Sequence, residues 1–481
     1  MNRRMICYTL GRIVQVMAFL LFLPALVAVL YRESCVWDFL ITIVLALGCG
    51  SVLALLSKPR DHVIYAKEGF IIVSLAWVAM SALGALPFVL SGEIPSFVNA
   101  FFETVSGFTT TGASILDNVE EMSHGLLFWR SFTHWIGGMG VLVFVMAILP
   151  NISDRSIHIM RAEMPGPIVG KLVPRAKDTA KILYLIYIVM TAVQVVLLLC
   201  GGMSLFDSLI HTFGTAGTGG FGVKSTSIGG YSPYLQWVIT IFMLLFGINF
   251  NLYYLVLIRR FRSAVRSSEL WWYIGVVVVS IAVITWNISD KTSTFGDSFR
   301  TAAFQVSSII TTTGYSTVDF NLWPQLSKTI LLILMFIGGC AGSTAGGLKV
   351  SRVLILLKRV RRELRRMIHP RSVNSVQFEG KTIPDVTLNN VTVYLAIYFF
   401  IYFIVLLLLS FEPFDFETNF SATAACFNNV GPGFSLVGPA SSYSAYSPFS
   451  KWVLSFAMLF GRLEIFPLIL TLSPTTWSKN K

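Results

Sequence analysis

Charged side chains are scarce in this chain: they make up 12% of its 481 residues, whereas hydrophobic residues make up 55% and the mean hydropathy is +0.72. A soluble globular domain carries roughly a quarter charged residues. The composition therefore excludes an ordinary soluble domain and indicates a membrane protein. The six cysteines show neither CxxC nor metal-ligand spacing, so nothing indicates a disulfide framework or a cysteine metal site.

Catalytic motifs are missing as well. The chain contains no HExxH, no GxSxG and no paired intramembrane acids, which are arrangements that metal-dependent or nucleophilic chemistry uses. A G-x4-G spacing runs from Gly342 to Gly347, but Leu348 follows where a phosphate-binding loop needs lysine. We therefore predict that the protein is not an enzyme and binds no organic cofactor.

Apolar runs near the length of about 20 residues that crosses hydrocarbon recur along the chain. We expect ten of them to be membrane spans, the eighth interrupted by glycines. Their approximate bounds are 11–31, 37–56, 69–90, 126–150, 179–201, 234–258, 270–288, 325–358, 390–411 and 449–473. The fold class expected is an all-α, multi-pass membrane protein.

The distribution of lysine and arginine predicts the orientation. If the N-terminus is cytoplasmic, the segments on that side hold 28 of the 36 basic residues, in line with the positive-inside rule. We therefore expect both termini in the cytoplasm. The net charge of +12 then reflects topology and contact with membrane lipid, and we expect no nucleic-acid partner.

Four further apolar segments are too short to cross the membrane. They cover residues 96–108, 204–217, 297–311 and 417–428, and each ends at a polar turn centred on glycine. Aligning the turns places Gly112, Gly220, Gly314 and Gly431 in register, at intervals of 108, 94 and 117 residues. The repeated unit is a span, a half-length helix, a polar turn and a second span.

We therefore predict two leading transmembrane (TM) helices followed by four TM–pore helix–filter–TM repeats in a pseudo-four-fold arrangement. The expected divisions are 1–68 for the leading pair, 69–178 for repeat one, 179–268 for repeat two, 269–389 for repeat three and 390–481 for repeat four. Repeat three includes a broken second TM helix and a basic cytosolic extension. In the other repeats we expect the second span to be uninterrupted.

The polar turns have a physical reason to lie at membrane depth. Non-helical backbone is tolerated there only where protein buries it or where it lines a watery cavity. Four re-entrant turns around one axis would present rings of carbonyl oxygens, which can replace the hydration shell of an alkali cation. A single Thr-Gly cluster could equally be an outer turn or a small-residue helix contact, but four in phase favour a pore.

A glycine-rich segment interrupts the eighth run. Its five glycines are Gly338, Gly339, Gly342, Gly346 and Gly347, and each costs a helix roughly 1 kcal/mol relative to alanine. A flexible loop at this depth could plug a pore or swing aside. The alternative is close packing of small residues between helices.

Arg462 is the one basic residue expected well inside a span, and Glu464 is the one buried acid expected. Arg462 could project into the pore beneath the filter as an electrostatic barrier, or it could belong to a structural ion pair. Glu464 is the nearest acid, but side chains at i and i+2 diverge on a helix. The basic segment 349–370 is either a membrane-surface anchor or a lever that joins the glycine loop to a docked regulator.

Together the motifs resemble those of a known family. The four turns read TTTGAS, GTGGFG, TTTGYS and NNVGPG, and further motifs are RAEMPGP (161–167), GGCAGSTAGGLK (338–349) and FGRLE (460–464). This set is similar to the TrkH/TrkG branch of the Trk/Ktr potassium-uptake superfamily, over nearly the whole chain. The resemblance implies a bacterial inner-membrane subunit that transports potassium, forms a homodimer and is gated by a cytosolic, nucleotide-binding, TrkA-like ring.

Transferred position by position, the resemblance implies a potassium filter made of Thr110, Thr111, Gly112, Thr218, Gly219, Gly220, Thr312, Thr313, Gly314, Asn429, Val430 and Gly431. It assigns gating to the glycine-rich segment and, as the favoured role, to Arg462. Only repeats one and three keep Thr-Thr-Gly. This short, unequal filter leads us to expect weaker discrimination among K+, Na+ and Rb+ than in a dedicated potassium channel.

The leading functional hypothesis is therefore a potassium-translocating pore subunit with a filter of backbone carbonyls and a glycine-rich gate. The alternative is a K+/H+ or K+/Na+ symporter. Such a transporter needs an ion-binding carboxylate or histidine near the midplane of the membrane, and Glu464 is the only candidate expected from the sequence.

Overall fold

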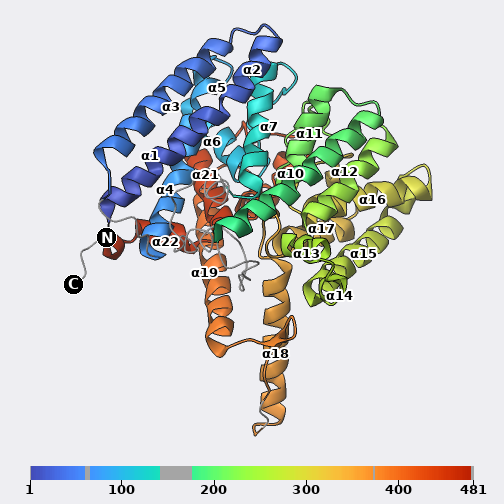
Figure 1. The fold of residues 1–481 in the computed structure, drawn as a ribbon. Coiled ribbons are helices and arrows are strands. Elements are labelled where there is room, and N and C mark those ends of the chain that lie inside the picture. The colour runs from blue at the N-terminus through green and yellow to red at the C-terminus, as the bar shows by residue number, and fades with distance from the viewer. Residues whose placement is uncertain (1, 60–65, 141–175, 372–373, 478–481) are drawn as a thin grey trace.

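The computed structural model describes residues 2–59, 66–140, 176–371 and 374–477. Regular structure in these ranges is almost entirely helical (Figure 1), and the one sheet is a hairpin of two short strands, β1 (Gln377–Phe378) and β2 (Lys381–Thr382). The all-α class expected from the sequence is confirmed. The motif at 161–167 lies outside the described residues.

The chain begins with two helical rods that lie side by side (Figure 1). The first consists of α1 (Arg3–Leu20) and α2 (Phe22–Leu30), and the second is α3 (Val36–Leu56). Two glycines let the rods approach closely: a Cβ added to Gly11 would lie 2.6 Å from the carbonyl oxygen of Gly50. Small residues are the common contact between membrane helices.

Four groups of helices follow, each with a half-length helix of 12–16 residues. The first contains α4 (Ala66–Gly84), α5 (Leu86–Leu90), α6 (Phe97–Phe108) and α7 (His124–Gly138). The second contains α10 (Ala176–Cys200), α11 (Leu205–Gly217), α12 (Pro233–Phe246), α13 (Phe250–Leu257) and α14 (Phe261–Val265). The third contains α15 (Ser268–Ile288), α16 (Phe295–Ile310), α17 (Gln325–Ile337) and α18 (Val350–Ile368). The fourth contains α19 (Asp385–Leu409), α20 (Phe416–Phe427), α21 (Pro448–Arg462), α22 (Phe466–Leu472) and α23 (Pro474–Trp477).

The short helices α6, α11, α16 and α20 contain 12, 13, 16 and 12 residues, and they lie where the sequence predicts half-length helices. Two of them have side-chain caps: Ser204 and Thr294 each accept a hydrogen bond from the backbone N–H three residues further on. Helices of this size span about 20 Å, too little to cross a membrane. We call these four helices the pore helices.

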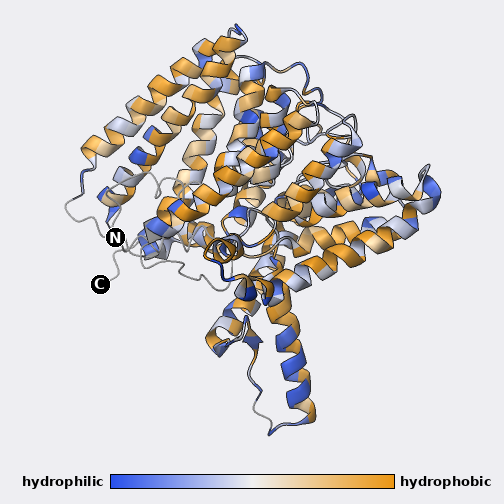
Figure 2. Ribbon diagram, turned by 45° about the vertical axis from the view of Figure 1, so that its right-hand side comes forward, coloured by the Kyte–Doolittle hydropathy of each residue, from blue (hydrophilic) through white to orange (hydrophobic). Residues whose placement is uncertain are grey.

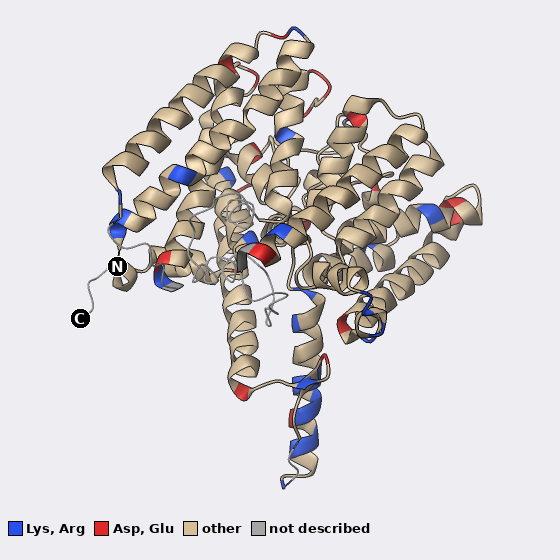
Figure 3. Ribbon diagram, in the orientation of Figure 1, with Lys and Arg blue, Asp and Glu red and all other residues tan. Residues whose placement is uncertain are grey.

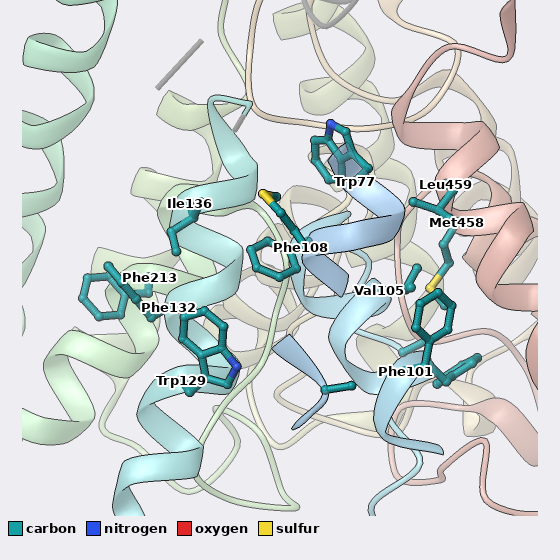
Figure 4. Packing of buried hydrophobic residues seen from close by; sticks show 14 of the residues in the cluster. Trp77, Phe101, Val105, Phe108, Trp129, Phe132, Ile136, Phe213, Met458 and Leu459 are labelled. Atoms are coloured by element: carbon teal, nitrogen blue, oxygen red, sulfur yellow. The ribbon is translucent and has the colours of Figure 1, made fainter. Parts of the chain in front are cut away.

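Large side chains wedge the first pore helix between its neighbours (Figure 4). Phe101, Val105 and Phe108 of α6 are buried, and the ring of Phe108 meets the ring of Trp129 edge-on at a centroid distance of 5.9 Å. The indole Nε1 of Trp129 donates to the carbonyl oxygen of Gly84 at 3.0 Å. Burying one phenylalanine contributes roughly 1.5–3 kcal/mol, so α6 is firmly held.

Within the described ranges, six helical segments are long and apolar enough to cross a membrane, or seven if one bent pair is counted as a single span. The chain is therefore multi-pass, but ten continuous spans are not what the structure shows. The expected span 126–150 is represented by α7 up to Gly138, and residues 141–150 lie outside the described part. The span 325–358 is interrupted after Ile337, as its glycines predict, and the span 449–473, expected to be continuous, is divided into two helices.

The expectation that only repeat three has a broken second span is wrong. In repeat two, α12 and α13 meet at 89°. The break occurs because the segment 338–349 between α17 and α18, which we call the glycine segment, bonds to the backbone there. The N–H of Cys340 donates to the carbonyl oxygen of Gly247 at 3.0 Å, and the N–H of Phe250 donates to that of Gly342 at 2.9 Å. Backbone freed from a helix at membrane depth needs such partners.

Repeat four breaks as well, between α21 and α22. Glu464 and Ile465 adopt φ values of +54° and +67° there, which helical residues do not adopt. The carboxylate of Glu464 pairs with the guanidinium of Arg352 of α18 at 2.6 Å, and this contact with another repeat holds the break in place.

Apolar residues predominate along the helices of the body (Figure 2). Leu56, Trp286 and Phe400 are 80%, 73% and 67% exposed, as expected for side chains that face lipid. Basic side chains gather instead on α18, the helix that projects furthest from the body (Figure 3). The N-terminus lies at the end of the body from which α18 projects (Figure 1).

Candidate ion pathway

The four polar turns share one unusual backbone conformation. Their first residues, with φ in parentheses, are Thr110 (+55°), Thr218 (+58°), Thr312 (+56°) and Asn429 (+56°). Their third residues are Gly112 (+80°), Gly220 (+79°), Gly314 (+82°) and Gly431 (+95°). A left-handed conformation costs a non-glycine residue about 1–2 kcal/mol, so its recurrence at four aligned positions indicates a shared structural requirement.

Each pore helix ends in the same hydrogen-bonded cap. In the first repeat, the N–H of Thr110 donates to Gly107 at 3.1 Å, and the N–H of Thr111 donates to Ser106 at 2.9 Å, both to carbonyl oxygens. Equivalent pairs of bonds occur in the other three repeats. This is a Schellman-type ending, with threonine or asparagine at the position that glycine usually takes. The cap turns the chain back just where the helix stops.

The four turns form a closed ring. A Cβ added to Gly112 would lie only 2.0 Å from the carbonyl oxygen of Gly219, which belongs to the next repeat. The same relation joins Gly220 to Thr313 (2.1 Å), Gly314 to Val430 (2.2 Å) and Gly431 to Thr111 (2.6 Å). Repeat four thus returns to repeat one. The glycines are required because a side chain would collide with the neighbouring carbonyl group.

Side chains of the turns point in two directions. Thr111 and Thr313 turn back to the pore helices, where their hydroxyls lie 2.8 and 2.7 Å from those of Thr109 and Thr311. Thr312, at the first position of its turn, instead accepts the N–H of Gly346 at 2.6 Å. The groups that all four turns have in common are therefore backbone carbonyls.

A cavity of about 270 Å³ opens on one side of the ring. All four ring glycines line it, together with Asp117, Arg130 and Lys224. Asp117 accepts a hydrogen bond from the hydroxyl of Ser444 at 2.9 Å. The cavity connects the ring to the protein surface on the side away from the glycine segment, none of whose residues lines it.

The glycine segment closes against the other side of the ring. The N–H of Gly347 donates to the carbonyl oxygen of Asn428 at 3.1 Å, beside the bond from Gly346 to Thr312. Gly338, Gly342 and Gly347 adopt φ of +72°, +71° and +76°, and a Cβ on Gly339 would lie 2.7 Å from Cβ of Ala345. The segment is therefore folded tightly rather than extended.

Arg462 binds the glycine segment from below the ring. Its guanidinium donates to the carbonyl oxygen of Thr344 at 2.9 Å and to those of Gly137 and Gly138, at the end of α7, at 2.5 and 2.6 Å. The structural ion pair with Glu464 is not formed, because Glu464 pairs with Arg352. Arg462 of repeat four thus connects the end of α7 in repeat one to the glycine segment in repeat three.

Glu269 binds both the glycine segment and the first turn of α18. Its Oε1 accepts the N–H of Ala341 at 2.7 Å and the N–H of Ser351 at 3.2 Å. The N–H of Glu269 itself donates to Oε1 of Glu379 at 3.0 Å, which lies in the turn of the β1–β2 hairpin. Two carboxylates therefore connect the hairpin, the start of α15 and the glycine segment.

Several buried charges escaped the sequence analysis. Glu464 is only partly buried, whereas Glu103 and Glu269 are buried, at 1% and 4% exposed. Arg462 is likewise partly buried, whereas Arg130 is 4% exposed and pairs with Glu103 at 2.6 Å. A glutamate within a short apolar helix was a usable signal for Glu103. Its pairing with a residue 27 positions later in the chain was not readable from periodicity.

No group of three or more His, Cys, Asp or Glu side chains suited to a metal ion occurs in the part of the chain that the structure describes. The architecture defines a class of protein: a multi-pass helical membrane protein built around a ring of re-entrant backbone turns. The chain belongs to the TrkH family of cation transport proteins, whose family model matches residues 37–479. It is accordingly a transport protein and not an enzyme.

Relatives are alike over their full length. The Trk system potassium uptake protein TrkH is 38% identical over 487 residues in Salmonella typhimurium, covering 99% of this chain and 100% of the relative. TrkG of Escherichia coli strain K12 is 35% identical over 486 residues, with 98% of each chain covered. The crystal structure of the potassium transporter TrkH from Vibrio parahaemolyticus matches with a TM-score of 0.89 at 34% identity, covering 99% of this chain and 100% of that one. The TrkH/TrkG resemblance is confirmed.

Proposed function

We propose that this protein is the potassium-translocating pore subunit of an uptake system in the bacterial inner membrane. The cation passes through the ring of turns, and the glycine segment gates it. The observation that carries the proposal is the closed cycle of contacts in which each ring glycine faces a carbonyl oxygen of the next repeat. The choice of potassium as the transported ion rests on the relatives, which are named potassium uptake proteins.

The ring suits a dehydrated cation for two reasons. Carbonyl oxygens held around one axis can replace the water shell of K+ and still release the ion. Each pore helix ends at the ring, so the partial negative charge at its C-terminus points toward the ion. We assign the filter to the twelve residues 110–112, 218–220, 312–314 and 429–431.

Discrimination among alkali cations should be modest. The fourth turn carries Asn429 and Val430, followed by Pro432. The hydroxyl of Tyr443 donates to the carbonyl oxygen of Gly431 at 2.8 Å, which weakens that oxygen as an ion ligand. An unequal ring controls ligand distances less strictly than four identical turns do. Competition of Rb+ uptake by K+ and Na+ in liposomes measures this, and a very strong preference for K+ over Rb+ would contradict it.

The glycine segment is the proposed gate. It lies against the ring through Gly346 and Gly347, and Arg462 and Glu269 hold it with hydrogen bonds. Passage of an ion requires this segment to move aside. Arg462 also places a positive charge beneath the ring, which opposes a cation at that point.

A cytosolic TrkA-like ring is the proposed regulator, and a homodimer is the proposed assembly. The segment that would transmit the signal is α18, which continues directly from the glycine segment and carries Arg359, Arg361, Arg362, Arg365 and Arg366. Phe378 of the hairpin packs with Leu354 of α18 in a separate buried cluster. A partner that displaces the hairpin or α18 would act on the glycine segment through Glu379 and Glu269. Anchoring at lipid headgroups is the other role that this basic helix suits.

The test is radioactive Rb+ uptake into liposomes that contain the purified chain alone, and then the chain with its cytosolic ring and nucleotides. Uptake that responds to nucleotide supports the pore and its regulation together. Uptake by the chain that ignores the ring would remove the regulator from the proposal. The absence of any K+ or Rb+ flux under either condition would refute the pore.

Coupled symport is the alternative. The structure offers the buried carboxylates of Glu103 and Glu269 besides the partly buried one of Glu464, but Glu103 and Glu464 are ion-paired and Glu269 accepts two backbone N–H groups. A transported ion would have to displace these partners. Uptake measured with and without an imposed proton or sodium gradient separates the two mechanisms, since only a symporter accumulates K+ at the expense of the second gradient.

A further inference from the structure

The backbone that leaves the second turn has few side chains to hold it. Residues 219–222 consist of three glycines and Phe221. Neighbouring repeats hold this stretch instead. On one side, the hydroxyl of Tyr315 in repeat three donates to the carbonyl oxygen of Phe221 at 2.9 Å. On the other side, the guanidinium carbon of Arg130 in repeat one lies 3.4 Å from the centroid of the Phe221 ring.

Arg130 also reaches the first turn, through a single carboxylate. Its Nε donates to Oε1 of Glu103 at 2.6 Å, and both side chains are almost completely buried. The same carboxylate accepts the hydroxyl of Ser114 at 2.9 Å and the N–H of Ile115 at 2.9 Å. These two residues lie two and three positions after Gly112, so one ion pair contacts the backbone that leaves both the first and the second turn.

Among the equivalent positions of the four repeats, the ion pair occurs only in repeat one. The four residues that lie nine positions before the ring glycines are Glu103, His211, Gln305 and Ala422. The Nε2 of His211 lies 3.2 Å from the hydroxyl of Tyr231, and the side-chain amide of Gln305 has no hydrogen-bond partner among the described residues. Of these positions, only Glu103 carries a charge that a buried arginine neutralises.

We propose that Arg130, held by Glu103, is a positioning residue for the filter: it fixes the spacing between the first and second turns where they open into the outer cavity, and so sets the ion preference. This inference rests on the proposed function of the ring. Because the two charges neutralise each other, the pair acts on the passing ion through geometry. A guanidinium suits the task, because its rigid fork binds a carboxylate while its flat face stacks on an aromatic ring.

The test compares Arg130→Lys and Glu103→Gln with the unmodified chain in liposomes. Lysine keeps the charge but loses the fork and the stacking, and glutamine keeps the shape but loses the charge. We expect K+ to lose its advantage over Na+ as a competitor of Rb+ uptake, with the ratio of the two falling at least about tenfold, the lower end of the effect of one lost hydrogen bond to a charged group. Should either variant fail to fold, the double variant Glu103→Gln with Arg130→Gln, which leaves no unpaired buried charge, serves in its place.

The matched control is Arg300→Gln, which removes an ion pair with Asp297 in the first turn of another pore helix. In this variant, the ratio of K+ competition to Na+ competition against Rb+ uptake should equal that of the unmodified chain. A purely structural role for Arg130 would lower the melting temperature and leave the ratio unchanged, and that result would overturn the inference. If the unmodified chain carries no Rb+ at all, it is the proposed pore that fails.

Discussion

Two glycine-containing regions of this protein, the ring turns and the glycine segment, are held in place by different kinds of contact. The ring turns are buried between pore helices that are fixed by large side chains, such as Phe108 against Trp129. The glycine segment is held by hydrogen bonds of its backbone, which accepts one from Arg462 and donates one to Glu269. If the segment moves, water can take over as the partner of these hydrogen-bonding groups, whereas buried aromatic packing has no such replacement.

The comparison teaches that glycine content alone does not define mobility. In the ring, a missing side chain allows a close and permanent approach between backbones. In the glycine segment, the same absence lets the chain leave its helix and fold against the ring, and it is this arrangement that the proposed gating would reverse. The surroundings decide which of the two applies.

The largest effect is expected in the ring. Gly112→Ala places a Cβ 2.0 Å from the carbonyl oxygen of Gly219, at a φ of +80°. Because the ring cannot relax, Rb+ uptake into liposomes should fall at least about tenfold. Gly92→Ala is the matched control, since Gly92 has a φ of +77° but nothing within 4 Å of the added Cβ. Equal losses in both variants would mean that the backbone conformation, and not the ring contact, is responsible.

Removal of the side chain beneath the ring should have the opposite effect. Arg462→Ala deletes the donors to Thr344, Gly137 and Gly138. Loss of these bonds and of the positive charge should raise K+ flux roughly fivefold. Uptake is to be compared at equal amounts of folded protein, checked by gel filtration. Unchanged or slower flux would assign Arg462 a structural role.

A methyl group in the glycine segment should also raise flux, in contrast to one in the ring. In Gly346→Ala, the Cβ would lie 2.4 Å from the carbonyl oxygen of Asn428, which pushes the segment away from the turns. We expect Rb+ uptake to rise roughly threefold. Gly48→Ala, where the Cβ meets nothing within 4 Å, should leave uptake unchanged. A fall in Gly346→Ala would show that the ring yields before the segment does.

The smallest expected effect is on thermal stability and lies outside both regions, at Glu33 between α2 and α3. Burial acts to raise the pKa of Glu33, but hydrogen bonds from the N–H groups of Gly125 and His124 outweigh it and hold the pKa below the ordinary value of 4.5. Such a carboxylate stabilises the fold above its unfolded pKa, and this contribution is lost as pH falls through the folded pKa. Glu33→Gln should therefore melt lower than the unmodified chain at pH 7, with the difference shrinking below about pH 4. A difference that stays constant with pH would contradict this account.

Local features were readable from the sequence because they depend on neighbouring residues. The half-length helix at 205–217 could be predicted from the length of its apolar segment and from the glycine turn after it. The position of Gly220 followed from alignment of the four turns. The interruption at 338–349 followed from five glycines in an apolar run. The bend between α12 and α13 was not readable, because its cause lies in contacts with a segment some ninety residues further along the chain.

By itself, the sequence determined that the chain is a multi-pass helical protein with four half-length helices, each followed by a turn with glycine at its third position. Apolar length and glycine conformation are sufficient for that. Only the tertiary structure decided that the turns close on one another, that Arg130 meets Glu103, and that Glu464 pairs with Arg352 instead of any residue near it. These contacts join residues far apart in the chain, and packing of whole helices, which no local pattern encodes, brings them together.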